Sequence, residues 1–333
     1  MQSPFELTKR LIEIPSVTGT EREIGEFLAS HLVERGYRVE RQMVSGDRFN
    51  VLAFAGEGRV MFCTHIDTVP PASLPIRADE DSDYLYGRGA CDTKGIISAM
   101  LEAGDRLRAQ GILNFGYLFV VGEETDGIGA RTANTLAWKS EYVVIGEPTQ
   151  NKLAKAQKGT VMLHLHATGR AAHSGYPEQG ISAISNLFEV LQDCARADWG
   201  SEAVLGNGSF NVGVFQGGHA ANIVPPSATA SIMIRTVETG TLVEDKMRRI
   251  VGNRATMEVV GATDPLVLHV VDGFETTVVS FGSDAPHLTK MGKRLLIGPG
   301  SILDAHTAGE KISKRELLDG IALYERLVRQ LLT

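Results

Sequence analysis

Hydrophobic and polar residues follow a helical period in the first part of the chain. Between Ser3 and Gly36, apolar residues recur every three to four positions, which is typical of amphipathic helices. Ser3 followed by Glu6 predicts an N-cap with a capping box, and the sequence TERE at 20–23 predicts a second box that opens a second helix. Gly36 predicts the end of that helix.

Three strongly apolar segments then follow, with a helical segment between the first two. RVMFCTH (59–65), NFGYLFVVGEE (114–124) and EYVVIGEP (141–148) show little polar alternation. Such runs are typical of strands that are covered on both faces in an α/β sheet. The stretch 92–111 predicts a long amphipathic helix that ends at Gly111. The expected fold class is therefore layered α/β.

The pattern changes after Lys158. TVMLHLHATG (160–169) alternates in the manner of a half-exposed strand, and the order of elements that follows is β-α-β-β-α-β. That order is typical of ferredoxin-like modules, so we predict an inserted domain at 159–264. The first domain then comprises 1–158 and 265–333, and its second part supplies one more strand and the closing helix.

Composition and charge restrict the possible partners and the compartment. The chain has 333 residues and a formal net charge of −7, which disfavours nucleic acid or an anionic membrane as the main partner. Its three cysteines form no C-x-x-C pair, which favours a reducing compartment. The N-terminal residues contain no apolar segment of signal or membrane length, so we expect a cytoplasmic protein.

Side chains that can bind a metal lie at the ends of the predicted strands or at the start of a helix. They are His65, Asp92, Glu123, Glu124, Glu147 and His306. Each alone has an ordinary structural explanation; Asp92, for example, can simply cap a helix. The carboxyl ends of parallel strands, however, border the ligand crevice of an open α/β sheet, so we expect these side chains to converge. Imidazole and carboxylate ligands together predict zinc. Asp67, two residues after His65, is placed to orient that ligand.

Six motifs, in order along the chain, resemble those of a known family. HIDTVP, GRGACDTKG, GEETDGIGA, GEPT, AAHSGYPEQGISAI and GGHAANIVPPSATASIMIR are similar to the successive motifs of the di-zinc family of acetylornithine deacetylase, succinyl-diaminopimelate desuccinylase, aminoacylase and related exopeptidases. The resemblance implies that two zinc ions bind per chain, with cobalt or manganese as possible substitutes.

The resemblance also implies a role for each ligand. His65 and Glu147 would bind one zinc, Glu124 and His306 would bind the other, and Asp92 would bridge the two. Glu123 would be the general base, taking a proton from the water that the metals acidify and delivering it to the leaving amine. A cis peptide bond between Asp92 and Thr93 is expected as well.

By the same resemblance, the inserted domain is a lid and a dimerisation domain. His173 would stabilise the oxyanion, and Asn222 and Arg235 would hold the substrate carboxylate, for which the planar guanidinium fork is suited. The alternatives are that Arg235 ends a strand in a surface ion pair and that His173 only caps the following helix. We expect a homodimer in which His173 completes the partner's site, paired through the strand at 160–169 or the helix that begins at Gly180. Five further histidines are interpreted as structural: His164 and His166, which alternate on one strand face, and His31, His269 and His287, which match no motif.

One stretch bears on the substrate. LIGPGSILDAHTAGE (296–310) and SFGSDAPHL (280–288) resemble acetylornithine deacetylases more than desuccinylases. This favours an enzyme that removes an acetyl group from an amino acid such as acetylornithine or acetyllysine. The alternatives are a desuccinylase, a dipeptide-cleaving metalloexopeptidase, and a zinc-bound interaction protein without catalytic activity.

Overall fold

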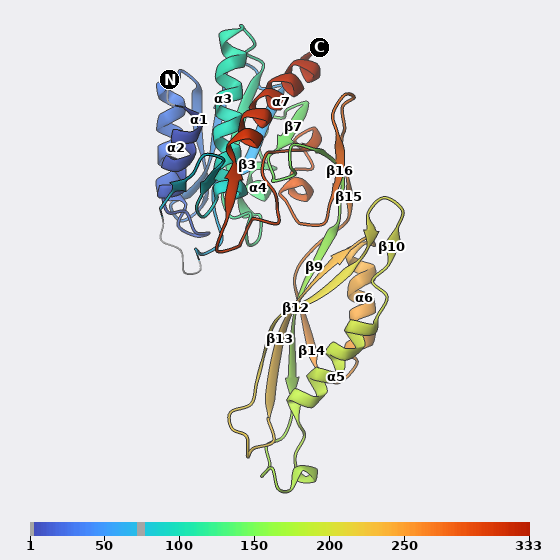
Figure 1. The fold of residues 1–333 in the computed structure, drawn as a ribbon. Coiled ribbons are helices and arrows are strands. Elements are labelled where there is room, and N and C mark those ends of the chain that lie inside the picture. Colours follow the sequence, from blue (N-terminus) through green and yellow to red (C-terminus); the bar gives the residue numbers. More distant parts are fainter. Residues whose placement is uncertain (1–2, 72–76) are drawn as a thin grey trace. The chain divides into compact units, whose positions relative to one another are not determined.

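The computed structural model describes residues 3–71 and 77–333, and the chain forms two compact units (Figure 1). Unit 1 comprises Met1–Lys155, Leu268–Thr277 and Ser283–Thr333, and unit 2 comprises Ala156–Val267 and Val278–Gly282. The sequence places the inserted domain at 159–264 as one continuous segment. Residues 278–282 join unit 2 because this return segment pairs with its start, where the Lys158 N–H donates to the Val279 carbonyl.

Unit 1 is built on a six-stranded sheet with the order β1-β2-β6-β3-β7-β17. The strands are β1 (Arg38–Ser45), β2 (Arg48–Phe54), β3 (Val60–His65), β6 (Phe115–Val120), β7 (Tyr142–Ile145) and β17 (Lys293–Leu296). β3 runs parallel to β6 and β7, and β17 runs parallel to β7, whereas β1 and β2 are antiparallel. The carboxyl ends of β3, β6, β7 and β17 therefore lie at one edge of the sheet.

The helices of unit 1 are α1 (Pro4–Glu13), α2 (Arg22–Glu34), α3 (Gly95–Ala109), α4 (Ile128–Ala133) and α7 (Lys314–Leu332). The predicted cap of α1 is confirmed, because the Ser3 hydroxyl accepts from the Glu6 N–H at 3.2 Å. The capping box at 20–23 is wrong. α2 begins at Arg22 without a side-chain cap, and the Glu21 carboxylate instead accepts two hydrogen bonds from Arg48.

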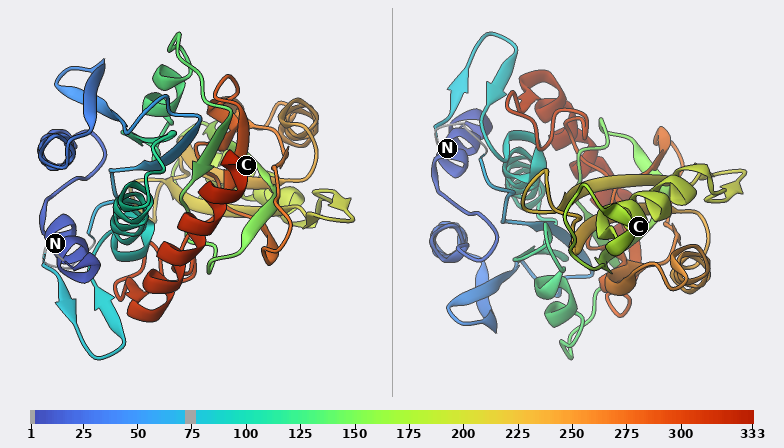
Figure 2. Two further views of the ribbon diagram at one scale, coloured as in Figure 1. Left: turned by 90° about the horizontal axis from the view of Figure 1, so that it is seen from above. Right: turned by 90° about the horizontal axis from the view of Figure 1, so that it is seen from below.

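The core of unit 1 lies between the sheet and the helix pair α3 and α7, which run side by side (Figure 2). Every residue of β3 and β6 is buried, as the continuous apolar runs predict. The helix α3 approaches the sheet so closely that a Cβ on Gly104 would lie 1.7 Å from the Tyr117 hydroxyl. This packing fixes the strands whose ends carry the candidate ligands.

Two small sheets and three short helical turns complete the connections. One sheet has the order β18-β5-β4, and the other, through which the chain passes between the units, has the order β15-β8-β16. Their strands are β4 (Asp79–Glu80), β5 (Tyr84–Tyr86), β8 (Leu153–Gln157), β15 (Leu266–Val267), β16 (Thr276–Val279) and β18 (Lys311–Ser313). The turns are η1 (Ala90–Lys94), η2 (Pro177–Gln179) and η3 (Ala285–His287).

Unit 2 has the predicted β-α-β-β-α-β order, interrupted by a two-stranded hairpin. Its elements are β9 (Gly159–Thr168), α5 (Ala183–Arg196), β10 (Ser201–Glu202), β11 (Gly206–Asn207), β12 (Ser209–Gly217), β13 (Ser227–Thr236), α6 (Gly240–Val251) and β14 (Thr256–Thr263). The antiparallel sheet has the order β12-β13-β9-β14, and α5 and α6 cover one face. The layered α/β fold with an inserted ferredoxin-like domain is thus confirmed.

This sheet order corrects one expectation. The strand at 160–169 corresponds to β9, which lies between β13 and β14 and so offers no free edge. The edges of the sheet are β12 and β14. Within the described residues, no helix is long and apolar enough to cross a membrane.

Candidate active site

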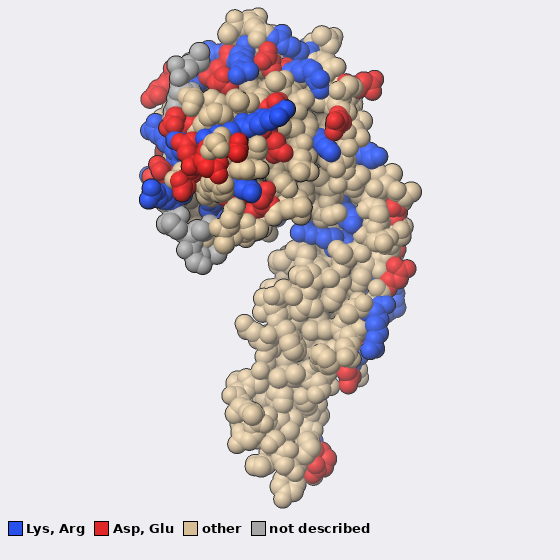
Figure 3. Space-filling view, viewed as in Figure 1, with Lys and Arg blue, Asp and Glu red and all other residues tan. Residues whose placement is uncertain are grey.

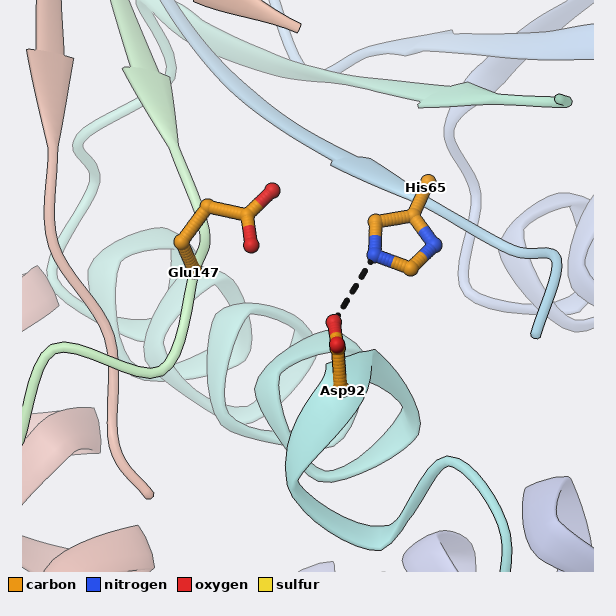
Figure 4. Close-up of side chains that lie close together, drawn as sticks. All are labelled: His65, Asp92 and Glu147. Carbon is orange, nitrogen blue, oxygen red and sulfur yellow. Dashed lines mark hydrogen bonds and ion pairs between the residues drawn. The ribbon is translucent and has the colours of Figure 1, made fainter. Parts of the chain in front are cut away.

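Three of the candidate ligands meet at the carboxyl edge of the sheet in unit 1. His65 ends β3, Asp92 lies in the turn before α3, and Glu147 follows β7. Figure 4 shows their side chains pointing toward one another. His65 Nε2 lies 3.0 Å from Asp92 Oδ1, and one ligand atom from each of the three residues lies within 4.8 Å of the others. All three residues are buried.

A second group shares Asp92 with the first. His306, in the loop after β17, places Nε2 3.1 Å from Glu124 and 3.4 Å from the Asp92 Oδ2 atom. Ligand atoms of Asp92, Glu124 and His306 again lie within 4.8 Å of one another. The two oxygens of Asp92 thus face the two groups separately, which is the geometry that a bridging carboxylate needs. The Asp92–Thr93 peptide bond is cis, as the family resemblance implies.

The electrostatics of both groups suit divalent cations. Burial lowers the pKa of His65, but hydrogen bonds to Asp67 and Asp92 outweigh it and raise that pKa well above its usual value. Hydrogen bonds to Asp92 and Glu124 raise the pKa of His306 to about 10. Carboxylates that attract protons so strongly onto imidazoles also attract metal cations. The nitrogen and oxygen donors are those that zinc takes in proteins, so the residues fit a pair of such ions.

Asp67 contacts both His65 and the loop after β6. His65 Nδ1 bonds at 2.9 Å to the backbone carbonyl of Asp67, while the Asp67 carboxylate lies 3.6 Å from that nitrogen. The carboxylate accepts instead from the backbone N–H groups of Gly122, Glu123 and Glu124, at 3.0 to 3.2 Å. Asp67 therefore orients His65 through its main chain and holds the loop after β6 through its side chain.

Glu123 lies beside both groups and belongs to neither. Burial and nearby carboxylates, Asp284 among them, raise the pKa of Glu123 well above its usual value. Burial raises the pKa of Glu147 in the same way. A carboxylate with a raised pKa next to metal ligands is suited to accept a proton and return it.

Sequence reasoning missed three buried residues around these ligands. Burial raises the pKa of Asp284, which follows β16, to about 7. Arg88 and Glu310 form a buried ion pair next to Asp92. All three lie in stretches quoted for the family resemblance, Arg88 in GRGACDTKG, Asp284 in SFGSDAPHL and Glu310 at the end of 296–310, but no pattern assigned them a role.

Unit 2 carries the remaining predicted residues in two separate places. His173 and Asn222 lie together, since a bridge joins His173 to Ile223 and the Ser174 N–H donates to the Asn222 carbonyl. The His173 Nδ1 atom accepts from the Gly175 N–H, within a turn. Arg235 lies near the C-terminal end of β13 and pairs with Thr160. Ser227, at the start of β13, pairs with Thr168.

Comparison with known proteins places the chain in a family. Residues 61–330 match the model of peptidase family M20/M25/M40. A peptidase M20 domain-containing protein of Schizosaccharomyces pombe is 37% identical over 335 residues, which cover 97% of this chain and 83% of that protein. A probable carboxypeptidase of Aspergillus clavatus is 36% identical over 97% of this chain and 87% of its own.

The fold also has a match among solved structures. The crystal structure of an M20 family metallo-carboxypeptidase from Sulfolobus solfataricus matches with a TM-score of 0.82 and 16% identity, over 99% of both chains. The protein belongs to the M20 peptidase family. Membership confirms the predicted enzyme class, a hydrolase of amide bonds.

Proposed function

We propose that this enzyme is a di-zinc hydrolase that removes an acyl group, most readily acetyl, from the nitrogen of an amino acid such as acetylornithine or acetyllysine. One observation carries the proposal: two groups of metal-binding side chains share Asp92 and lie beside a carboxyl group, Glu123, that is in neither group. In this proposal His65 and Glu147 hold one ion, and Glu124 and His306 hold the other. Cobalt or manganese can replace zinc at such donors.

The residues of unit 1 divide the chemistry among them. Bound cations would supply a water of lowered pKa and polarise the scissile carbonyl. Glu123, whose pKa is raised by burial, takes the proton of that water and passes it to the leaving amine. Asp67 keeps Glu123 in place, because its carboxylate accepts the Glu123 N–H at 3.2 Å.

The residues of unit 2 would recognise the substrate. Arg235 can hold the free carboxylate of an amino acid in bidentate fashion, and Asn222 can add a hydrogen bond. His173 can donate to the oxyanion that forms during hydrolysis. Recognition of an α-carboxylate next to the scissile amide suits both an N-acyl amino acid and the C-terminal end of a short peptide.

The geometry of unit 2 supports action across a dimer. In β13, Arg235 pairs with Thr160 and Ser227 pairs with Thr168. These two residues of β13 are eight positions apart, a span of about 27 Å at about 3.4 Å per residue. Arg235 lies at one end of this span, and the pair of His173 and Asn222 lies beyond the other. One small substrate cannot contact all three residues of a single chain, so we propose that two chains contribute to each site and that His173 serves the partner's.

The edge strand β12 suits such a homodimer. Among the described residues, no strand pairs with its outer side, and it exposes the apolar side chains of Val212, Val214 and Phe215. The face of unit 2 that Figure 3 shows carries few charged side chains. An exposed, apolar and uncharged edge strand is a surface that pairs with another strand unless it is covered.

A second candidate function uses the same site. The Aspergillus clavatus relative is named a probable carboxypeptidase, and its identity of 36% extends over 97% of this chain. A carboxypeptidase or dipeptidase would cleave an amide bond with the same metals, the same Glu123 and the same contact to a substrate carboxylate. A desuccinylase differs only in the acyl group.

For location we propose the cytoplasm, since all three cysteines are buried free thiols.

A substrate panel tests the proposal. Zinc-loaded and chelator-treated protein is assayed with acetylornithine, acetyllysine, the corresponding succinyl compounds and short peptides, with Glu123→Ala as the control for the assignment of the base. Highest kcat/KM for acetyl compounds, abolished by chelation, supports the deacetylase. Preference for peptides supports the carboxypeptidase instead, and absence of turnover on every substrate would leave a zinc-binding interaction protein.

Coexpression tests the action of His173 across the dimer. A mixed dimer of Glu123→Ala and His173→Ala chains has one intact site only if His173 acts on the partner's site. We expect the mixed dimer to recover up to half of the wild-type turnover. A mixed dimer as inactive as either parent would show that His173 acts within its own chain or not at all.

A further inference from the structure

A buried ion pair lies next to the ligand that the two candidate metal groups share. An Arg88 terminal nitrogen contacts Glu310 Oε2 at 2.5 Å, and the two side chains are only 6% and 1% exposed. Arg88 precedes Asp92 by four residues, and Glu310 follows His306 by four. The pair therefore joins the two chain segments that carry two of the candidate ligands.

The second oxygen of Glu310 holds the main chain at Asp92. Glu310 Oε1 accepts from the backbone N–H groups of Cys91 and Asp92, at 3.3 Å each, and from the Cys91 thiol at 3.7 Å. One carboxylate thus binds a guanidinium with one oxygen and the backbone of the bridging ligand with the other. This arrangement sets where the Asp92 side chain begins.

Arg88 reaches the second ligand segment. Its other terminal nitrogen donates to the Thr307 carbonyl at 3.4 Å, directly after His306. The two segments are also paired through their backbones, since the Gly87 N–H donates to the Glu310 carbonyl at 3.0 Å and β5 pairs with β18. Arg88 and Glu310 thus connect the start of the Asp92 turn to the end of the His306 loop.

The group that contains His306 depends most on such a connection. The His65 side chain is 1% exposed and is held at the end of a central strand, whereas the His306 side chain is 50% exposed. His306 also adopts a left-handed backbone conformation with φ of 60°. A ligand that is so weakly enclosed by packing needs its loop to be fixed by other contacts.

We propose that Arg88 and Glu310 are positioning residues that fix the spacing between Asp92 and His306, so that the second metal ion binds tightly. The inference rests on the proposed di-metal function and deepens it. A contribution to stability alone does not require this pair, because apolar residues of similar volume often replace a buried ion pair without loss. A carboxylate that accepts from the backbone of a ligand has a more specific use, and outer contacts of this kind change metal affinity by about 10-fold to 100-fold.

Glu310→Gln is the variant that separates positioning from packing. It keeps the shape of the side chain but has one oxygen, so either Arg88 or the backbone N–H groups of Cys91 and Asp92 lose their acceptor. Asp105→Asn is the matched control, since it removes the charge of another ion pair in unit 1, with Arg35 at 3.1 Å, that contacts none of the candidate ligands.

Metal affinity is the readout. Each protein is stripped with chelator and titrated with Zn²⁺ against a chromophoric competitor, and with Co²⁺ by visible absorption. Unfolding of the metal-free protein is followed in parallel. We expect Glu310→Gln to weaken the second ion by 10-fold or more and the first ion by less, and saturating metal to restore turnover. Asp105→Asn should bind both ions as the wild type does.

The outcomes are distinguishable. Second-ion binding by Glu310→Gln that equals the wild type, or an equal loss in Asp105→Asn, would overturn the positioning role. Wild-type protein that binds fewer than two ions would overturn the proposed function itself. If Glu310→Gln does not fold, Arg88→Lys replaces it: lysine keeps the charge but lacks the second terminal nitrogen that donates to the Thr307 carbonyl, and second-ion affinity must again fall for the proposal to stand.

Discussion

Replacement of Asp67 by Asn tests whether one buried carboxylate holds the loop that carries both Glu123 and Glu124. Its Oδ1 atom accepts from the N–H groups of Gly122 and Glu123, and its Oδ2 atom accepts from the Glu124 N–H and the Thr18 hydroxyl. Asparagine has nearly the same shape but carries only one acceptor oxygen, so at least one of these backbone N–H groups must face an amide NH₂.

The size of the effect follows from this count of donors. In the least costly orientation, the amide oxygen keeps Gly122 and Glu123, and the Thr18 hydroxyl turns to accept from the new NH₂. The Glu124 N–H, whose bond to Asp67 is part-buried, then loses its partner, at a cost of about 1–3 kcal/mol. The two retained bonds lose the assistance of a full charge, which adds roughly 1 kcal/mol. We therefore expect a total loss of about 2–4 kcal/mol in the free energy of unfolding.

Thermal unfolding of chelator-treated protein measures this loss without a contribution from metal. For a domain of this size, about 2–4 °C of Tm accompanies each kcal/mol, so Asp67→Asn should lower Tm by about 5–15 °C. Thr18→Val is the control, because it removes one donor while the carboxylate keeps all three N–H groups. Its expected loss is about 1 kcal/mol.

Turnover should fall together with stability in Asp67→Asn, because Glu123 and Glu124 both move when their loop is released. If the free energy of unfolding of Asp67→Asn lies within about 1 kcal/mol of the wild-type value and turnover is kept, the loop is held by its other contacts. That result would refute the role given to the Asp67 hydrogen bonds.

Three further outcomes are expected. Glu123→Ala should retain both metal ions but lose turnover by about 10²-fold or more, the contribution of a general base, as measured by metal analysis and steady-state kinetics. His306→Ala should bind one ion per chain, since only the group that contains His306 loses a ligand; two tightly bound ions would contradict this. Burial lowers the pKa of His31 from 6.5 to about 4, so its contribution to stability is complete above pH 6.5 and is lost as the pH falls toward 4. Unfolding of His31→Gln should therefore depend less on pH in that interval, and an unchanged dependence would refute the role of His31.

Much of the fold was predictable because its signals are local. Continuous apolar runs identified the buried strands β3, β6 and β7, and turn residues separated them from helices. The parallel arrangement of those strands then brought His65, Glu124 and Glu147 to one edge, which a general rule about open α/β sheets anticipates. Local signals also identified the order of elements in unit 2.

The edge of the second sheet was not predictable from the same signals. β9 alternates between buried and more exposed residues, and this alternation reports only that one face of the strand is covered. It carries no information on whether the backbone groups have neighbours on both sides. The position of β9 between β13 and β14 depends on pairings with residues 227–236 and 256–263, which no local pattern encodes.

Long-range partners explain the other differences. The box at 20–23 matches a capping pattern, but Arg48, remote in sequence, engages the carboxylate of Glu21. Asp67 lies two residues from His65, and this position predicts its influence on that ligand. Its carboxylate also accepts from the backbone N–H groups at 122–124, more than fifty residues away, which no local pattern indicates.

Two ligand-bearing turns in unit 1 are held in the same way, because in each a buried carboxylate accepts backbone N–H groups of the turn. Asp67 does this for the turn with Glu124, and Glu310 does it for the turn with Asp92. Removal of a ligand such as His306 takes away one metal contact and leaves its loop anchored, so the metal-free protein should keep its stability. Removal of a carboxylate that holds a turn leaves backbone N–H groups without an acceptor, so stability and metal affinity should fall together. A substitution that lowers both metal affinity and the stability of the metal-free protein therefore marks a residue that holds a turn. A substitution that lowers metal affinity alone marks a residue that binds the ion.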